Sequence, residues 1–406
     1  MKILFTTPVL EHPAAGGPQL RIENSIIALN RVSELHVISR VDKRSLGGNC
    51  ADKYFREHCH EFVYAPSIDR LSCNRYFRTF QSISRNLFKN FLFKSDADFI
   101  IDYAEKKRID LLWFGYGNIS YPLIKEIKEK RPLFKVVCDT DSVWSRFILR
   151  ELPYENDPVR RKQIERTGKL KEQEEREWVN LCDVTTAVSV VDAYYYQNFA
   201  DKPEKIKIFS NVINLETYSQ VMIPPEGFRK PCFYIAGSFW PKSPMEKATR
   251  WIISEVLPLV RKELPQINFY IIGQGSKEIL NDIMDSNITI TGKLPSVLPY
   301  LCNADVSIVP LTFESGTRFK ILEAAACCIP SVSTSLGAEG IAVEDGKNII
   351  IADNPESFAD AIIRLIKDKV YAKQIAKNCM RLIQNKYSID ALVCEANSII
   401  NYVTKQ

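Results

Sequence analysis

The stretch from residue 305 to residue 341 holds the densest group of side chains that could do chemistry. It opens with an apolar run typical of a buried strand and continues, after a short loop, into a helix that we expect to begin near Gly316 and Thr317. The unpaired backbone N–H groups at the start of a helix attract phosphate. Arg318 and Lys320 add two full positive charges to this turn. The stretch therefore predicts a phosphate-binding site.

A carboxylate follows within one helical turn of these cations. Glu323 comes three residues after Lys320, and positions three apart lie on the same face of a helix. On that face its carboxylate could accept hydrogen bonds from the two hydroxyl groups of a ribose. A phosphate site and a diol site at this spacing match one half of a nucleotide.

Alternating strands and helices are expected to position these residues. Short apolar runs alternate with helical patterns along the chain, including KILFT, ELHVIS, DLLWFG and FKVVCD in the first half and CFYIAG, NFYIIG and DVSIVP in the second. This alternation is typical of βαβ units with a parallel sheet. Ligands of such sheets bind beyond the carboxyl ends of the strands. We therefore expect an α/β fold with two facing, doubly wound Rossmann-like domains and an interdomain cleft.

The chain length and one irregular segment indicate the domain boundaries. A length of 406 residues favours two domains, at roughly 100 to 200 residues for each. Residues 211–230 contain Pro224, Pro225 and Gly227 and lack clear periodicity, which is typical of a linker. The prediction is one domain over residues 1–210 and a second over residues 231–386.

Composition and charge exclude several classes of protein. The net charge of +5 lies entirely in the first half, because residues 1–210 hold 34 Lys and Arg against 29 Asp and Glu, whereas the rest of the chain holds 20 of each. So small an excess argues against nucleic-acid binding. The eleven cysteines are scattered without a C-x-x-C pair, which favours reduced thiols, and no apolar run suits a signal peptide or a membrane span. We expect a cytoplasmic protein.

Residues 70–94 carry six cations and no acid. Placed on a helix, their aromatic and aliphatic side chains fall in one broad stripe, and most of the cations fall opposite it. Two interpretations remain open. The helix packs its apolar stripe on the first sheet, or it docks on an anionic membrane surface. In the second case the protein is peripheral on the inner face of the membrane.

The residues around the predicted nucleotide site resemble a known family. The run G-T-R-F-K-I-L-E-A, followed by I-P-S-V-S-T and G-A-E-G-I, is similar to the donor-binding signature of the retaining nucleotide-sugar glycosyltransferases of the GT-B fold, family 4. The resemblance is dense over residues 231–368 and thin before residue 180. It implies transfer of a sugar from a UDP- or GDP-linked donor to a glycan or lipid-linked acceptor, in bacterial surface polysaccharide or glycoconjugate assembly. It also implies that a C-terminal helix, residues 387–406, crosses back to the first domain.

The same resemblance implies roles for individual residues. Glu323 matches the second glutamate of the family's E-x7-E motif, which holds the donor ribose. The positions that match the family's contacts with the diphosphate or the donor sugar are Arg318, Lys320, Gly237, Ser238, Lys242, Gly16 and Gly17, and the predicted helix start adds Gly316 and Thr317.

The motif departs from the family pattern at one place. The first glutamate of E-x7-E is expected eight residues before Glu323, where this chain has Ser315, and Glu314 lies one residue too early. Either the loop slips so that Glu314 reaches the sugar hydroxyls, or Ser315 and the main chain hold the sugar. The identity of the sugar therefore stays open.

The reaction needs positive charge at the departing diphosphate and a group that receives the acceptor's proton. Arg318, Lys320 and the helix terminus would supply the charge, so we expect no metal and no cofactor, with the nucleotide-sugar as a substrate. Asp139 and Asp141 follow a predicted strand and could receive the proton. Alternatively, these two acids cap a helix that starts near Val143.

Some features of the sequence allow other interpretations. A catalytically silent nucleotide-binding protein of the same fold would account for Ser315. A two-domain dinucleotide oxidoreductase would need G-x-G-x-x-G, and neither AAGGPQ nor IIGQGS has this pattern. His58 and His60 flank Cys59, but no further ligand is expected nearby, so a loop or edge position is favoured over a metal site.

Overall fold

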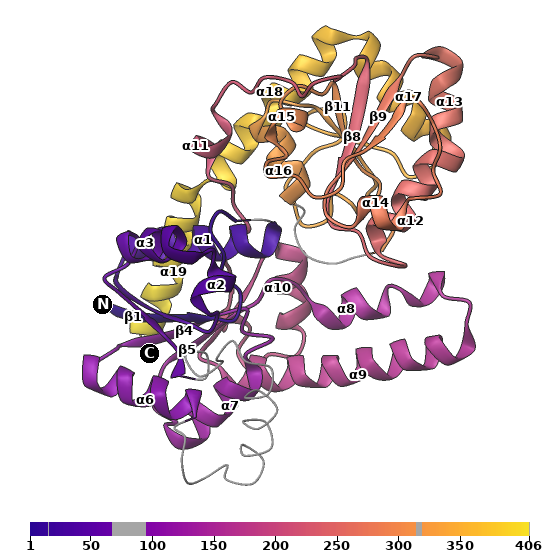
Figure 1. Cartoon of the computed structure of the whole chain (residues 1–406). Coiled ribbons are helices and arrows are strands. Elements are labelled where there is room, and N and C mark those ends of the chain that lie inside the picture. Colours follow the sequence, from indigo (N-terminus) through magenta and orange to yellow (C-terminus); the bar gives the residue numbers. More distant parts are fainter. Residues whose placement is uncertain (15, 67–94, 314–318, 406) are drawn as a thin grey trace, which may run out of the picture. The chain divides into compact units, whose positions relative to one another are not determined.

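The computed structural model divides the chain into two α/β units (Figure 1). It describes residues 1–14, 16–66, 95–313 and 319–405. Unit 1 comprises Met1–Asp141, Lys171–Phe209 and Leu392–Gln406, and unit 2 comprises Ser142–Leu170 and Ser210–Ala391. Each unit contains one parallel sheet with helices, so the predicted α/β class is confirmed.

Unit 1 is built on a seven-stranded parallel sheet with the order β3-β2-β1-β4-β5-β6-β7. Its strands are β1 (Lys2–Thr7), β2 (Glu34–Ser39), β3 (Glu61–Tyr64), β4 (Leu111–Gly115), β5 (Val136–Asp139), β6 (Val184–Ala187) and β7 (Ile206–Ile208). Its helices include α1 (Gly17–Asn30), α2 (Lys43–Leu46), α3 (Gly48–Glu57), α6 (Asp96–Lys107), α7 (Tyr121–Lys130) and α10 (Val190–Gln197), together with most of α19 (Ile389–Thr404). The strand order reverses between β1 and β4, and ligands of such sheets bind beyond the carboxyl ends at this switch point.

Unit 2 repeats this plan with a six-stranded parallel sheet of order β10-β9-β8-β11-β12-β13. Its strands are β8 (Cys232–Ala236), β9 (Asn268–Ile272), β10 (Ile288–Ile290), β11 (Val306–Val309), β12 (Ser331–Ser333) and β13 (Ile350–Ile351). Its helices include α8 (Trp144–Leu149), α11 (Leu215–Tyr218), α12 (Pro244–Trp251), α13 (Leu257–Glu263), α14 (Ser276–Ile279), α15 (Leu298–Leu301), α16 (Phe319–Ala326), α17 (Pro355–Lys367) and α18 (Lys369–Lys386). The long helix α9 (Pro158–Leu181) runs from unit 2 into unit 1.

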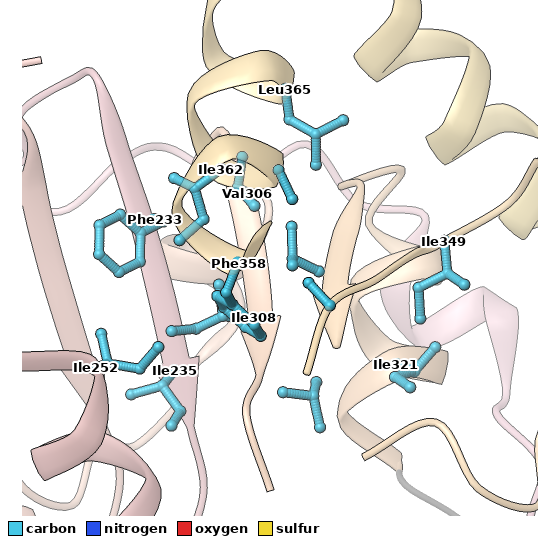
Figure 2. Packing of buried hydrophobic residues seen from close by; sticks show 14 of the residues in the cluster. Phe233, Ile235, Ile252, Val306, Ile308, Ile321, Ile349, Phe358, Ile362 and Leu365 are labelled. Carbon is cyan, nitrogen blue, oxygen red and sulfur yellow. The ribbon is translucent and has the colours of Figure 1, made fainter. Parts of the chain in front are cut away.

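A continuous apolar core fixes the sheet of unit 2 against its helices. Figure 2 shows side chains of this core cluster, among them Phe233 of β8, Ile308 of β11, Ile321 of α16 and Phe358 of α17. All four side chains are essentially inaccessible to water. Burial of each large apolar side chain contributes roughly 1.5–3 kcal/mol. Because α16 contributes to this core, the polar residues on its other face are held in place.

The division into units departs from the expected boundaries in one segment. Residues 142–170 group with unit 2, whereas the sequence placed them in a first domain over residues 1–210. The reason is visible in two ion pairs, in which Arg146 and Arg150 lie 3.1 and 2.6 Å from the carboxylate of Glu339. Residues 392–406, which make up most of the expected C-terminal helix, group with unit 1.

The basic segment at residues 70–94 lies outside the described residues, and both interpretations of it therefore stay predictions. Within the described ranges, the structure contains no helix that is both long enough and apolar enough to cross a membrane.

Candidate functional site

The turn after β8 brings two of the sequence-predicted residues together. The N–H of Gly237 donates to the carbonyl of Ile272 at 2.9 Å, which ties this turn to the end of β9. A Cβ atom at Gly237 would lie 3.0 Å from Cε of Lys320 and 2.9 Å from Cε of Met245. The Lys320 side chain of α16 therefore lies directly against the turn. Ser238 is exposed beside it.

A second glycine turn packs on the first. Gly273 follows β9 with φ at +131°, and a Cβ atom there would sit 1.9 Å from the carbonyl oxygen of Gly237. No other residue fits this approach, because L-amino acids rarely adopt this φ and the backbone oxygen cannot move aside. The two turns thus form one compact edge at the carboxyl ends of β8 and β9.

Lys242 lies in the loop that leads from Gly237 into α12. Its backbone has φ at +61°, and its N–H donates to the carboxylate of Glu246 at 2.7 Å. Its ammonium group is well exposed and lies 3.5 Å from the carboxylate of Glu155. Ser243 caps the helix by accepting a hydrogen bond from the N–H of Glu246. The position suits a cation that could turn toward a ligand at this edge.

The carboxylate of Glu323 is held by one hydroxyl group. Glu323 lies on α16 and is half-buried. Tyr218, the last residue of α11, donates its hydroxyl to Oε1 of Glu323 at 3.0 Å. Among the described residues, no second partner holds Oε2. One oxygen of the carboxylate is therefore held by the phenol.

Burial sets the protonation behaviour of this pair. It raises the pKa of Glu323 above its ordinary value of 4.5, although the Tyr218 hydrogen bond and the positive charge of Lys320 act in the opposite direction. Burial and the negative charge of Glu323 also raise the pKa of Tyr218 far above its ordinary value. The phenol therefore remains a proton donor at any physiological pH.

Five predicted residues of this region cannot be placed. Glu314, Ser315, Gly316, Thr317 and Arg318 all lie outside the described residues, and α16 is described from Phe319 onward. The choice between Glu314 and Ser315 as the sugar-binding residue therefore stays open.

A cavity of about 430 Å³ lies next to the Lys242 loop within unit 2. One wall consists of Trp240, Pro241, Lys242 and Pro244, and the remaining lining residues are Phe313, Phe147, Glu151 and Arg160. The Trp240 side chain is half-exposed. Aromatic faces beside charged groups suit sugar rings. The C–H groups of the sugar stack on the aromatic faces, and its hydroxyl groups form hydrogen bonds with the charged side chains.

In unit 1, Asp139 lies fully buried at the end of β5 and forms an ion pair with Arg21. Its Oδ1 accepts hydrogen bonds from Nη2 of Arg21 and, at 2.6 Å, from the hydroxyl of Thr186. The Arg21 guanidinium is equally buried and also donates to the carbonyls of Thr140 and Phe209 at 3.0 and 3.2 Å. This network gives Asp139 a structural role. Because its carboxylate is buried, an acceptor substrate could not reach it to transfer a proton.

Asp141 lies two residues further on and is partly accessible. Its Oδ1 accepts a hydrogen bond of 2.8 Å from the side-chain amide of Asn118, which follows β4. The helix that follows it, α8, begins at Trp144 with Val143 as its N-cap residue. Of the two acids, Asp141 is the one that remains a proton-acceptor candidate.

Gly16 and Gly17 mark the start of α1, after the loop that leaves β1. Gly16 is the N-cap residue with an extended backbone, and Pro18 follows within the first turn. A Cβ atom at Gly16 would meet its nearest neighbour at an ordinary 3.5 Å. The helix start suits an anion through its amides rather than through any steric need for glycine.

Comparison with known protein families identifies the segment that holds Glu323, Lys320 and Gly237. Residues 230–368 match the family described as glycosyl transferases group 1. These residues are similar to that family. The match begins just before β8 and ends after α17.

Two curated relatives are similar to part of this chain. An uncharacterized 44.6 kDa protein in the cps region of Klebsiella pneumoniae is 31% identical over 146 residues, which are 34% of this chain and 38% of that protein. D-inositol 3-phosphate glycosyltransferase of Paenarthrobacter aurescens is 32% identical over 124 residues, 27% of this chain and 30% of the enzyme. The matched stretches thus span well under half the length of either relative.

Solved structures share the whole fold of the chain. Sucrose-phosphate synthase of Thermosynechococcus elongatus superposes with a TM-score of 0.70 at 14% identity, and HepE of Anabaena in complex with UDP-glucose with 0.65 at 13% identity. Both comparisons cover 100% of either chain. The chain has the GT-B fold, as expected from the sequence.

Sequence reasoning missed several residues of unit 2 and of unit 1. Tyr218 lies in the segment FSNVINLETY, but nothing in that run marks it as a partner of a residue 105 positions away. Glu339 lies within the quoted G-A-E-G-I run, and its ion pairs with Arg146 and Arg150 were equally unmarked. Arg21, the partner of Asp139, falls in an ordinary helical pattern. Each of these contacts depends on topology that a local pattern does not contain.

Proposed function

We propose that the chain is a retaining glycosyltransferase that moves a sugar from a nucleoside diphosphate donor to a glycan or lipid-linked acceptor. The observation that carries the proposal is the placement of Glu323. Its carboxylate is oriented by Tyr218, and it lies one turn from Lys320, which covers the Gly237 turn. A ribose bound at Glu323 would place its diphosphate toward Lys320 and the two glycine turns.

The donor is proposed to be a UDP- or GDP-linked sugar. HepE, which shares the fold, was solved with UDP-glucose, and this supports a UDP-sugar. The matched relative in the cps region supports a role in bacterial surface polysaccharide or glycoconjugate assembly. For the acceptor or the sugar ring we propose the cavity lined by Trp240 and Lys242.

The proposed reaction depends on positioning and charge. The nucleoside diphosphate departs as an anion when the bond from the sugar to its phosphate breaks. Fixed cations and amide groups aimed at that anion lower the barrier. Lys320 and Arg318 with the start of their helix are proposed to supply this charge without a metal ion, and Asp141 is proposed to receive the acceptor's proton.

Incubation of the full chain with single UDP- and GDP-sugars tests the proposal. We expect release of the nucleoside diphosphate from at least one donor, unchanged by EDTA, and faster release when a glycan or lipid acceptor is present. Nucleotide binding without any turnover would favour the catalytically silent alternative. Absence of calorimetric binding for every nucleotide would contradict both functions.

The membrane association proposed for residues 70–94 is tested separately by sedimentation with liposomes. We expect the chain to pellet with anionic vesicles and to stay in solution with neutral ones, because each cation near the surface contributes about 1 kcal/mol. Equal recovery in both supernatants would contradict this part of the proposal.

A further inference from the structure

Unit 1 carries a second group of polar residues at the opposite end of its sheet from Asp139. Glu34 is the first residue of β2, His36 lies two residues later, and His60 directly precedes β3. The N–H of His60 donates to the carbonyl of Leu35 at 2.8 Å, so the two strands hold these side chains together at their amino ends. The expectation that His60 has no possible ligand nearby is therefore wrong.

The distances within this group match those around one small ion. Oε1 of Glu34 lies 3.2 Å from Nε2 of His36 and 3.6 Å from Nε2 of His60. All three ligand atoms lie within 4.8 Å of one another. Zn²⁺ binds imidazole and carboxylate at about 2.0–2.1 Å, which at a tetrahedral angle separates two ligands by roughly 3.3 Å. Small side-chain shifts would bring the three atoms onto one ion.

A second layer of contacts orients the buried histidine. Nδ1 of His36 faces the hydroxyl of Tyr103 at 2.9 Å and the carboxylate of Glu61 at 3.6 Å. A proton on Nδ1, bonded to these oxygens, leaves the Nε2 lone pair directed toward Glu34. Metal-bound histidines are commonly oriented by such a partner on the other ring nitrogen.

Two ammonium groups compete with an ion for the carboxylates around this group. Two cations lie close by, since Lys2 contacts Glu34 at 3.0 Å and Lys107 contacts Glu61 at 2.6 Å.

We propose that Glu34, His36 and His60 form a binding site for a divalent transition-metal ion of the zinc class. Two imidazoles and one carboxylate are a ligand set that Zn²⁺ takes with a fourth position left to water. The ammonium group of Lys2 moves away from Glu34 when the ion binds. The site lies at the amino ends of the strands, whereas sheet ligands bind at the carboxyl ends, so it is independent of the proposed glycosyl transfer.

Zinc titration of the full chain, freed of metal and kept in a non-chelating reductant, tests this proposal. Competition with a chromogenic chelator should show one site in the native chain. His60→Ala should weaken it at least about tenfold, and it should fold normally because His60 is mostly exposed. The matched control is His58→Ala, whose ring nitrogen bonds the carbonyl of Tyr54 at 2.8 Å and takes no part in the group.

Two further variants and one spectrum sharpen the result. Lys2→Ala should bind zinc more tightly, since it removes the competing cation, and Tyr103→Phe should bind it about tenfold more weakly. Co²⁺ should give the visible bands of a nitrogen and oxygen site. Equal zinc affinity in the native chain and His60→Ala, or a Co²⁺ thiolate band from a pair such as Cys302 and Cys327 (3.3 Å apart), would overturn the proposal.

Discussion

Each unit contains an acid with one main side-chain partner, and the two partners differ in charge. In unit 1, Asp139 is fully buried and is neutralised by the buried guanidinium of Arg21. In unit 2, Glu323 has a neutral phenol, Tyr218, as its partner. The carboxylate of Asp139 is neutralised by a guanidinium and is buried out of reach of a ligand. The carboxylate of Glu323 keeps its net charge when ionised, because a phenol does not neutralise it.

Breaking the unit 1 pair should have the largest effect, and it should fall on stability. Asp139→Ala leaves the Arg21 guanidinium buried without its partner, and we expect a loss of about 3–5 kcal/mol in the free energy of unfolding. Urea unfolding measures this loss. As a control, Glu165→Ala breaks the exposed 2.7 Å pair with Lys169 on α9, and it should cost less than about 1 kcal/mol. Similar losses in the two variants would contradict a structural role for Asp139.

The equivalent change in unit 2 should affect binding instead. Glu323→Gln keeps the shape but removes the charge that accepts the ribose hydroxyl groups. We expect nucleotide affinity to fall by roughly 10- to 100-fold, the range for hydrogen bonds to a charged group, with little change in thermal stability. Calorimetry with UDP and GDP measures this effect. The matched control is Glu263→Gln at the end of α13, which loses only an exposed ion pair with Lys367 of α17. This variant should bind the nucleotide normally.

Removing the phenol tests how the acid is held. Tyr218→Phe should reduce nucleotide affinity by roughly fivefold, which corresponds to about 1 kcal/mol. The hydrogen bond from Tyr218 lowers the pKa of Glu323, so its loss should raise that pKa further. The Glu323 carboxylate is expected to bind the ribose in its ionised form. Nucleotide affinity should therefore fall as the pH drops through the pKa of Glu323 in the folded protein.

The pH at which affinity is lost separates these variants. Since burial raises the pKa of Glu323, the native chain should lose affinity at a higher pH than an ordinary glutamate would allow. Tyr218→Phe should lose it at a still higher pH, and Glu323→Gln should show no such transition. Titration of affinity from neutral pH down to about pH 4.3, the ordinary pKa of glutamate, decides this. Identical pH profiles for the native chain and Tyr218→Phe would contradict a role for Tyr218 in nucleotide binding.

The smallest effects are expected from substitution of Gly237, in the turn after β8, and of Gly16, the N-cap residue of α1. Gly237→Ala places a methyl group 2.9–3.0 Å from Met245 and Lys320, so those flexible side chains shift and we expect a few-fold fall in kcat/KM. Gly16→Ala meets only ordinary contacts, and it should cost at most about 1 kcal/mol through the helix cap. Steady-state kinetics with the identified donor compares the two. A larger kinetic loss in Gly16→Ala would point to close backbone contact with the donor in unit 1.

The architecture could be predicted from sequence because its signals are local and repeated. The runs KILFT and CFYIAG correspond to β1 and β8, and the order of strands and helices follows from their alternation. One expected element differs in detail. The helical stretch that follows β8 consists of α12 and α13 with a π-helical turn at Ile252–Val256 between them, and the alternation of strands and helices does not predict this turn. Pro258 lacks the N–H that a regular helix would use there, which explains the interruption.

The site could be predicted in part. Glu323, Lys320 and Gly237 were identified because they belong to runs with a family signature or a helix start, and the structure places Lys320 beside Gly237. The partners that decide what an acid does were beyond reach, because Arg21 and Asp139 are 118 positions apart and Tyr218 and Glu323 are 105 apart. The local sequence around an acid does not show whether its partner is a guanidinium or a phenol. Burial and partner choice arise only once the sheet is assembled.

The connectivity of the units has a consequence for how the protein is made. The chain passes from one unit to the other near residues 141, 170, 209 and 391, so neither unit is one uninterrupted piece of sequence. Unit 1 receives its last helix, with buried Leu392, Ala396 and Ile399, after all of unit 2 has been translated. During synthesis on the ribosome, the later unit can therefore complete its fold before the earlier one, and an exchange of either half with a homologue requires four splice points.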